Sequence, residues 1–379
     1  MSARRSNGPG IATRVFGSQW FVSVLAVLIA FAIGAILIAL SGASVVDAYY
    51  AMFRGSIVDP NAANVVRMIK PLTDSLFYSI PLIISGLGLA LGFRAGLFNI
   101  GGKGQIIVGA LAAVWVGFAV SLPPVLHTLV ALLVAVIAGG LYGGIAGVLK
   151  AKTGANEVIV TIMLNSIATL GLGYTLAQKA WQVPGTNQPV TPKVADSAAL
   201  VRLLPAPFKL HVGFLVALVA LVAFWWLIER STLGFQIRAV GANAAAARTA
   251  GISVERITAI TMVLSGAFLG LAGANEALGT IGYVSRDVAG SIGFDAITVA
   301  LLGRNKTWGT FGAGLLFGAF KAGGYTMQAK GVPIDMILIL QSVIVLLIAA
   351  PALVRWLFRL PDVRALAANT RKGNADEHK

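Results

Sequence analysis

The chain contains a run of 21 residues without a charged side chain, from Trp20 to Leu40. A helix of that length can cross the about 30 Å of hydrocarbon in a bilayer. The run is too long for the apolar core of a signal peptide, which has roughly 7–15 residues. Similar runs follow in a chain that is 57% hydrophobic and 11% charged, whereas soluble domains are about 25% charged. The sequence therefore predicts an all-α membrane protein.

The apolar stretches predict about ten transmembrane helices, some of them short or broken. They cover residues 20–40, 72–93, 105–121, 125–149, 157–177, 211–228, 257–279, 290–303, 308–326 and 334–354. No shift of composition marks a separate soluble domain, so we expect one transmembrane domain over residues 1–379. The longest exposed loops are expected at residues 41–71, 178–210 and 229–256.

The basic residues predict how the chain is oriented. The net charge is +15, and most of the 29 basic residues fall in segments that are cytoplasmic if the N-terminus is cytoplasmic. Arg54, Arg67 and Lys70 are exceptions on the outer side. We therefore expect cytoplasmic ends at residues 1–19 and 355–379. Because the charges are scattered among apolar spans, we expect contact with membrane lipid and no binding to nucleic acid.

The sequence lacks the residues of several kinds of active site. It has no cysteine, which excludes thiolate metal sites and cysteine nucleophiles. Its three histidines, His127, His211 and His378, are far apart in the sequence. The stretch Gly102-Lys103-Gly104 is not a nucleotide-binding loop, since Ser or Thr does not follow the lysine. We therefore expect no catalytic residues, no metal and no cofactor in this chain.

Glycines recur at helical spacing on two of the expected spans. In lipid, close approach of backbones supplies much of the packing energy, and small residues allow it. One stripe consists of Gly139, Gly143 and Gly147, and the other of Gly266, Gly270 and Gly273. We expect both stripes to be helix-packing faces.

A glycine-rich stretch, "LGFRAGLFNIGGKGQIIVGA", interrupts the apolar pattern between Leu91 and Ala110. Two interpretations are open. Broken helices at membrane depth commonly build polar sites, provided that protein or water satisfies the freed backbone groups. A plain cytoplasmic turn between two spans is the alternative.

Polar side chains inside the spans are costly, so each needs a partner, a water-filled cavity or a function. Glu157, Thr161 and Asn165 share one helix face that we expect to point into the bundle. Glu157 is also placed as a helix-start charge, and Asn165 either lines a path or bonds between helices.

Three charged residues lie within later spans: Glu276, Asp295 and Lys321. They either pair with one another or line a polar translocation route.

The inner stretch "STLGFQIRAVGANAAAARTAGISVERI" differs from the other loops in its many alanines. Asn243 suits the N-cap of a short helix, and Gly251 suits its C-terminal stop. Such a helix either docks a soluble partner or rests on the lipid headgroups.

Four stretches together resemble the permease subunits of bacterial ABC importers for nucleosides and simple sugars. They are "GLFNIGGKGQ", "GANEVIVTIMLNSIA", "LGFQIRAVGANAAAARTAGI" and "GFDAITVALLGRNKTWGT". The resemblance implies a permease in the bacterial cytoplasmic membrane that is not itself an enzyme. It also implies three partners: a second permease, a cytoplasmic ABC ATPase that holds ATP and Mg, and an extracytoplasmic binding lipoprotein.

The resemblance also suggests roles for individual residues. The element that couples the permease to the ATPase would contain Gly234, Arg238, Gly241, Asn243, Ala247 and Gly251. The substrate pathway that we predict combines Phe98, Asn99 and Gln105, from the first stretch, with Asn165, Glu276 and Asp295. An ion-gradient-driven secondary transporter, with the buried charges as ion sites, is the alternative function.

Overall fold

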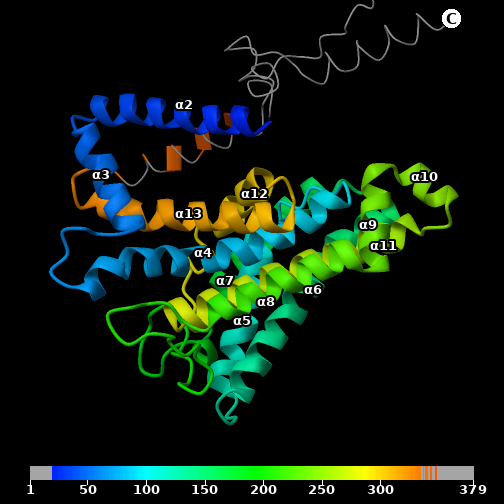
Figure 1. Cartoon of the computed structure of the whole chain (residues 1–379). Coiled ribbons are helices and arrows are strands. Elements are labelled where there is room, and N and C mark those ends of the chain that lie inside the picture. The colour runs from blue at the N-terminus through cyan, green and yellow to red at the C-terminus, as the bar shows by residue number, and fades with distance from the viewer. Residues whose placement is uncertain (1–18, 334–335, 337, 340–341, 344–345, 348–379) are drawn as a thin grey trace, which may run out of the picture. The chain divides into compact units, whose positions relative to one another are not determined.

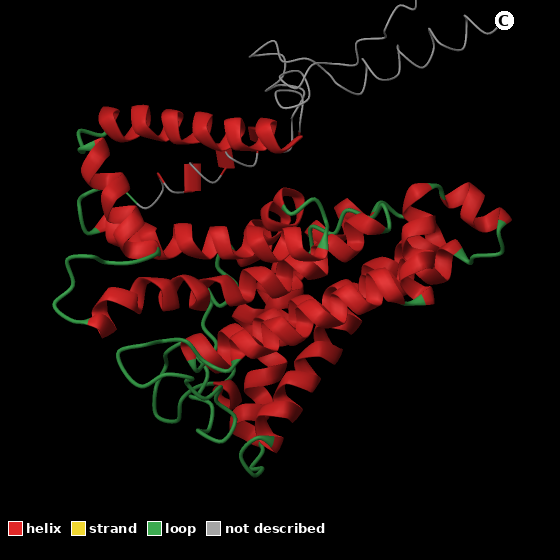
Figure 2. Cartoon of the chain, in the orientation of Figure 1, coloured by secondary structure: helices red, strands yellow, loops and turns green. Residues whose placement is uncertain are grey.

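The computed structural model describes residues 19–333, 336, 338–339, 342–343 and 346–347. These residues form helices and loops without a strand (Figure 2); the one bridge of β type joins Arg202 to His211. The chain divides into two compact units, residues 1–49 with 327–379, and residues 50–326.

The smaller unit contains helix α2, Gln19–Leu40, and the start of α3, Val45–Ser56. The rings of Phe31 and Tyr49 meet edge to face with centroids 5.4 Å apart, and the Tyr49 hydroxyl donates to the Phe31 carbonyl at 2.5 Å. The expected span at 334–354 lies largely outside the described residues, as do residues 1–18 and the tail at 355–379.

The larger unit is a bundle of helices (Figure 1). Its α-helices are α4 (Val65–Arg94), α5 (Gly102–Ala119), α6 (Leu126–Thr153), α7 (Glu157–Ala177), α8 (Gly213–Trp225), α9 (Thr232–Ala242), α10 (Ala244–Thr249), α11 (Val254–Asn275), α12 (Ile292–Leu302) and most of α13 (Thr307–Gln328). Two π-helical turns, η2 (Trp226–Arg230) and η3 (Glu276–Ile281), continue α8 and α11, and η1 (Lys179–Trp181) is a 3₁₀ turn.

Six helices among the described residues are long and apolar enough to cross a membrane. They are Val65–Arg94, Gly102–Ala119, Leu126–Thr153, Glu157–Ala177, Gly213–Arg230 and Val254–Ile281. These six match the second to seventh expected spans. The expected span at 290–303 is only the 11-residue α12, and the one at 308–326 is α13, which has 22 residues but is not among the six. The expected loop at 41–71 was wrong in part, because α3 lies within it.

Both glycine stripes are helix-packing faces, as expected: the stripe of α6 packs on Gly266 and Gly270 of α11, and Gly273 packs on α5. A Cβ atom on Gly139 would lie 2.6 Å from the Gly270 Cα atom, and one on Gly143 would lie 2.7 Å from the Met262 carbonyl oxygen. A Cβ atom on Gly109 of α5 would also overlap with the Gly270 backbone. The glycines thus bring three helix backbones into direct contact, which positions α11 at the centre of the bundle.

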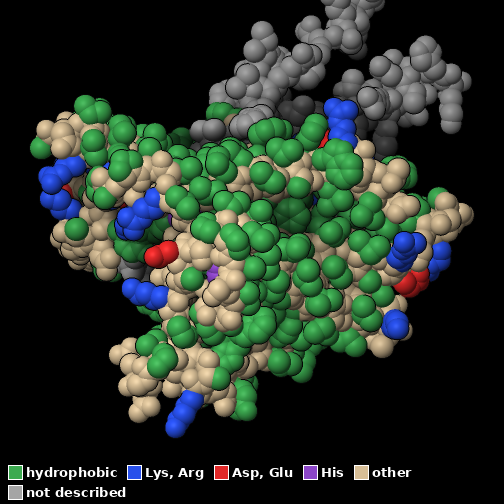
Figure 3. Space-filling view, turned by 90° about the horizontal axis from the view of Figure 1, so that it is seen from below, with side chains coloured by type: hydrophobic (Ala, Val, Ile, Leu, Met, Phe, Trp, Pro, Cys, Tyr) green, Lys and Arg blue, Asp and Glu red, His purple; other side chains and the backbone are tan. Residues whose placement is uncertain are grey.

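The outward faces of the spans are apolar. Leu129, Leu133 and Leu141 of α6 are 58%, 58% and 67% exposed. The face drawn in Figure 3 is covered by hydrophobic side chains over its middle, with Lys and Arg side chains toward its margins. This distribution, together with the six apolar helices, is that of a multi-pass membrane protein.

Candidate functional site

The glycine-rich stretch is a true helix break that is braced by Asn99. α4 ends at Arg94, and Gly96 has a φ of +73°, a conformation that glycine adopts without strain. Asn99 is fully buried, and its amide nitrogen donates to Ser265 Oγ at 3.0 Å and to Gln105 Oε1 at 3.1 Å. Its oxygen accepts from the Gly101 N–H at 2.8 Å and from Gln105 Nε2 at 3.3 Å. All hydrogen-bonding capacity of the Asn99 side chain is therefore used within the protein.

α7 braces the same break from a second side. The Asn165 side chain accepts from the Gly104 N–H at 2.7 Å and donates to the Ile100 carbonyl at 2.8 Å. Thr161 Oγ1 accepts from the Ile100 N–H at 3.2 Å. Both side chains are buried, so the expected inward face of this helix is confirmed. They satisfy backbone groups that a broken helix leaves open, as an apolar surrounding requires.

The break extends into the bundle. Ser265, the partner of Asn99, follows the start of α11 by 11 residues, a rise of about 16 Å. The stretch joins α4 to α5 as a turn, and its buried part is a polar structure of the kind that the first interpretation expects.

Glu157 ties the beginning of α7 to the same stretch. Its carboxylate accepts from Lys150 Nζ at 2.5 Å and from the Phe98 N–H at 3.4 Å. Phe98 itself is 38% exposed and packs against Phe93 with ring centroids 5.0 Å apart. The helix-start placement of Glu157 is thus confirmed, with a contact to the break as well.

The alanine-rich stretch forms the expected short helix, α10. Asn243 Oδ1 accepts from the Ala246 N–H at 3.0 Å, which makes Asn243 the N-cap. Gly251 has a φ of +83° and lies just beyond the end of α10. Along α10, Ala247 is the one buried side chain; the others face outward. The helix is therefore presented as an exposed surface beside the bundle.

Two glycines of α9 pack closely against neighbouring backbone, and one of them, Gly241, does so at the helix break. A Cβ atom on Gly241, at the end of α9, would lie 2.9 Å from the Ala95 carbonyl carbon and would overlap with the Arg94 carbonyl oxygen. A Cβ atom on Gly234 would lie 2.7 Å from the Ile228 carbonyl oxygen. The end of α9 thus touches the residues at which α4 ends.

A polar cavity of about 240 Å³ lies at this junction and is lined by Arg94, Ile228, Glu229 and Arg238. Arg94 Nε donates to the Asn305 carbonyl at 2.7 Å, which links α4 to the turn before α13. Arg238 of the predicted coupling element therefore shares a cavity with the C-terminal ends of α4 and η2.

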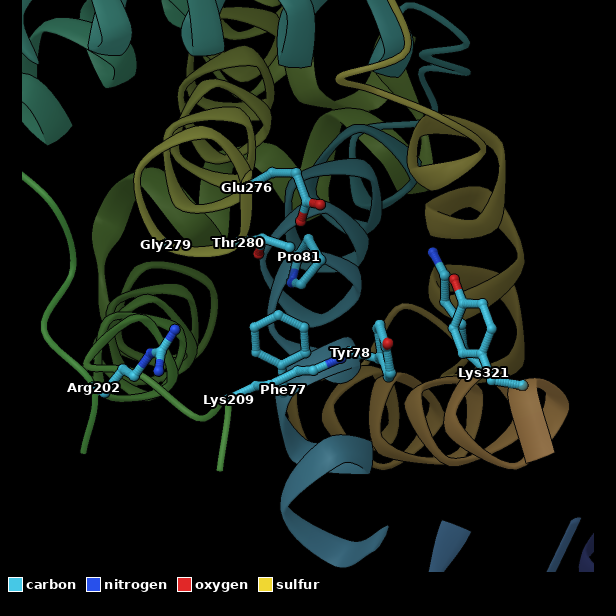
Figure 4. A pocket seen from close by; sticks show the side chains of 10 residues that line it. Phe77, Tyr78, Pro81, Arg202, Lys209, Glu276, Gly279, Thr280 and Lys321 are labelled. Atoms are coloured by element: carbon cyan, nitrogen blue, oxygen red, sulfur yellow. The ribbon is translucent and has the colours of Figure 1, made fainter. Parts of the chain in front are cut away.

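A second cavity, of about 410 Å³, lies among α4, η3, α13 and the loop before α8. Phe77 and Tyr78 of α4 contribute aromatic walls, Glu276 comes from the first residue of η3, and Lys321 comes from α13 (Figure 4). π-Helical turns of this kind frequently occur at functional sites. The cavity's opening carries exposed cationic side chains, Arg202 and Lys209.

The three charged residues of the later spans do not pair directly. The described residues contain no ion pair within 4.0 Å among Glu276, Asp295 and Lys321. The Lys321 ammonium acts electrostatically on both carboxylates, and Asp295 accepts a hydrogen bond from Ser291 Oγ at 2.7 Å. An intramembrane charge costs roughly 2.5–3.5 kcal/mol. Because Glu276 and Lys321 do not pair, they need a polar surrounding, and the cavity between them provides it.

His211 lies behind one wall of this cavity. Its ring meets the Phe77 ring edge to face, with centroids 5.5 Å apart, and Nδ1 accepts from the Gly213 N–H at 3.0 Å. Nε2 has no hydrogen-bond partner among the described residues. Burial lowers the pKa of His211 to about 4.

The predicted pathway residues fall into separate groups. Asn99, Gln105 and Asn165 gather at the helix break, whereas Glu276 lines the larger cavity. Phe98 and Asp295 are not among the residues that line it. Sequence reasoning missed Tyr78, Tyr325 and Arg202, because aromatic residues in spans and basic residues in loops are ordinary features of membrane proteins.

Comparison with known proteins gives consistent matches over most of the chain. Residues 72–349 match the family described as branched-chain amino acid transport system / permease component. The guanosine ABC transporter permease NupP of Bacillus subtilis is 40% identical, covering 89% of this chain and 95% of that protein. The glucose ABC transporter permease TsgB13 of Haloferax volcanii is 36% identical, covering 85% of each.

Further relatives occur in pairs within one organism. The nucleoside ABC transporter permease NupB of Lactococcus lactis is 31% identical over 92% of this chain and 95% of that protein. A second guanosine permease of Bacillus subtilis, NupQ, is 29% identical over 67% of this chain and 81% of that protein. No solved structure matches this chain.

Proposed function

The chain belongs to the family of permease components of branched-chain amino acid transport systems, and we propose that it forms the translocation path for nucleosides in an ATP-driven importer. Relatives named for guanosine and for nucleosides support nucleosides as the substrate class. A relative named for glucose makes a simple sugar the second candidate.

The observation that carries this proposal is the contact of α9 with the helix break. The exposed α10 continues α9, Gly241 of α9 lies against Arg94, and the residues after Arg94 bond to α7 and α11. We infer that α10 docks on a cytoplasmic ABC ATPase, which holds the ATP and Mg. Movement of that ATPase would then reach the buried polar residues and change access between the two sides of the membrane.

The remaining partners follow from the family. The pairs of relatives in one organism support a second permease of different sequence as the partner chain. A substrate-binding lipoprotein would deliver nucleosides to the outer side, and the exposed Arg202 and Lys209 are available to meet it. The assembly would lie in the bacterial cytoplasmic membrane.

Uptake in the native host tests the proposal. Cells with and without this gene are given labelled adenosine, uridine, ribose and xylose, under arsenate and under a protonophore in turn. We expect gene-dependent nucleoside uptake that arsenate abolishes and that the protonophore affects less. Uptake that fails only with the protonophore would instead indicate an ion-driven secondary transporter, and uptake of only a pentose would replace the substrate class.

A further inference from the structure

The larger cavity is lined by one acidic side chain and by three basic side chains. Glu276 and Lys321 point into the same space from opposite sides (Figure 4). They do not meet as an ion pair, so each side chain faces the cavity without the other as a direct partner. Both side chains are therefore available to hydrogen-bond a molecule that enters the cavity.

The two side chains offer opposite kinds of hydrogen bond. An ionised carboxylate only accepts, and an ammonium group only donates. A molecule that satisfies both must therefore present N–H or O–H donors on one side and acceptors on another. Charge-assisted bonds of this kind are stronger than neutral ones, so the match selects among substrates.

The walls of the cavity add a preference for a flat ring. The ring centroids of Phe77 and Tyr78 are 5.1 Å apart, and those of Tyr78 and Tyr325 are 5.4 Å apart. All three rings line the cavity. Its volume of about 410 Å³ is within the range of about 300–1,000 Å³ that is common for small-molecule sites.

We propose that Glu276 and Lys321 select a 6-oxopurine nucleoside during translocation. The Glu276 carboxylate accepts from the ring N1–H and the 2-amino group of a guanine-type base, and the Lys321 ammonium donates to its acceptors, which are O6 and N7. The aromatic walls hold the plane of the base. This inference rests on the proposed function, since it assigns a substrate class to the path of that same permease.

Uptake by the complete transporter in cells tests the role of the carboxylate. Glu276→Gln keeps the size of the side chain and removes its charge and one acceptor. The substrates are guanosine and purine ribonucleoside, whose base carries no N–H donor, each supplied at a concentration that gives measurable wild-type uptake. We expect guanosine uptake to fall about tenfold or more, with little change for the donor-free ribonucleoside.

Three further variants make the result specific. Asp287→Asn removes a carboxylate of the exposed outer surface and should leave both uptake rates unchanged. Glu276→Asp keeps the carboxylate and should restore part of the preference for guanosine. Lys321→Met tests the opposite wall, and it should also lower guanosine uptake more than uptake of a 7-deaza analogue that lacks N7.

The outcomes separate this inference from the proposed function. An equal loss for both ribonucleosides, with the variant present in the membrane, would show that Glu276 does not read the base. An unchanged guanosine rate would overturn the inference in the same way. If wild-type cells show no gene-dependent nucleoside uptake at all, the proposed function fails, and the inference fails with it.

Discussion

His211, in the loop before α8, packs against the wall of the larger cavity. It lies before the first residue of α8, and its ring packs against Phe77. A Cβ atom on Gly279, which also lines the cavity, would lie 2.6 Å from His211 Nε2. The glycine thus makes room for the imidazole, and protonation of this ring would place a charge among apolar groups.

This burial predicts a pH dependence of stability. The pKa of His211 is about 4 in the folded protein, below the ordinary histidine pKa of 6.5 that applies to the unfolded chain. The unfolded chain therefore binds the proton more readily. The neutral form stabilises the fold fully above pH 6.5, and that contribution is lost as the pH falls from 6.5 to 4. The loss is on the order of 3 kcal/mol.

Thermal unfolding of the detergent-solubilised protein between pH 7.5 and 4 measures this effect. His211→Gln has no proton to gain in this range, so its unfolding temperature should fall less steeply with pH than that of the wild type. Parallel pH profiles of the two proteins would show that His211 does not titrate in the way its burial requires.

Residue type and spacing could predict part of the site. Asn165 and Thr161 were placed on an inward face from helical spacing alone, and both are buried. Their partners could not be predicted, because Asn165 and Ile100 are 65 positions apart and Asn99 and Ser265 are 166 apart. Spacing fixes which side chains share a face, but only the packing of several helices decides what that face meets.

At the scale of elements, glycine positions predicted how the helices pack. Both stripes are packing faces, because small residues three or four positions apart leave a groove along one side of a helix. Which helix each stripe meets was not predicted: Gly266 and Gly270 meet α6, whereas Gly273 meets α5. The sequence did not predict the π-helical turn η3, which begins at Glu276, because the apolar pattern of the span continues through it. The larger cavity was also hidden from the sequence, because its walls come from four separate segments.

The packing of α6 on α11 predicts a strong effect of one methyl group. The Cβ atom of Gly270→Ala would overlap with the Ala135 carbonyl oxygen and lie 2.9 Å from the Gly139 Cα atom. The helices must separate to make room, which costs about 1–3 kcal/mol. We expect a lower unfolding temperature in detergent.

Gly171→Ala in α7 is the matched control. No atom lies within 4 Å of the added Cβ atom there, and alanine favours a helix over glycine by about 1 kcal/mol. The control should be as stable as the wild type or more so. Equal unfolding temperatures for the two variants would contradict the close packing of α6 and α11.

At the scale of the whole molecule, the described bundle has the exposed helix α10 and the larger cavity, which opens beside the loop before α8. Between them lie the helix break and the hydrogen bonds that brace it. The proposed importer would take its substrate from a binding protein and its energy from an ATPase, so its permease needs few polar groups. In that proposal, α10 is the docking surface for the ATPase.

Purification of the tagged chain from native membranes, with its partners identified by mass spectrometry, tests this claim most directly. We expect the wild type to retain an ABC ATPase. Ala245→Trp, on the exposed face of α10, should lose it, and Ala155→Trp, in the turn between α6 and α7, should keep it. An ATPase that stays bound to Ala245→Trp, or a wild-type chain that purifies without any ATPase, would contradict the account.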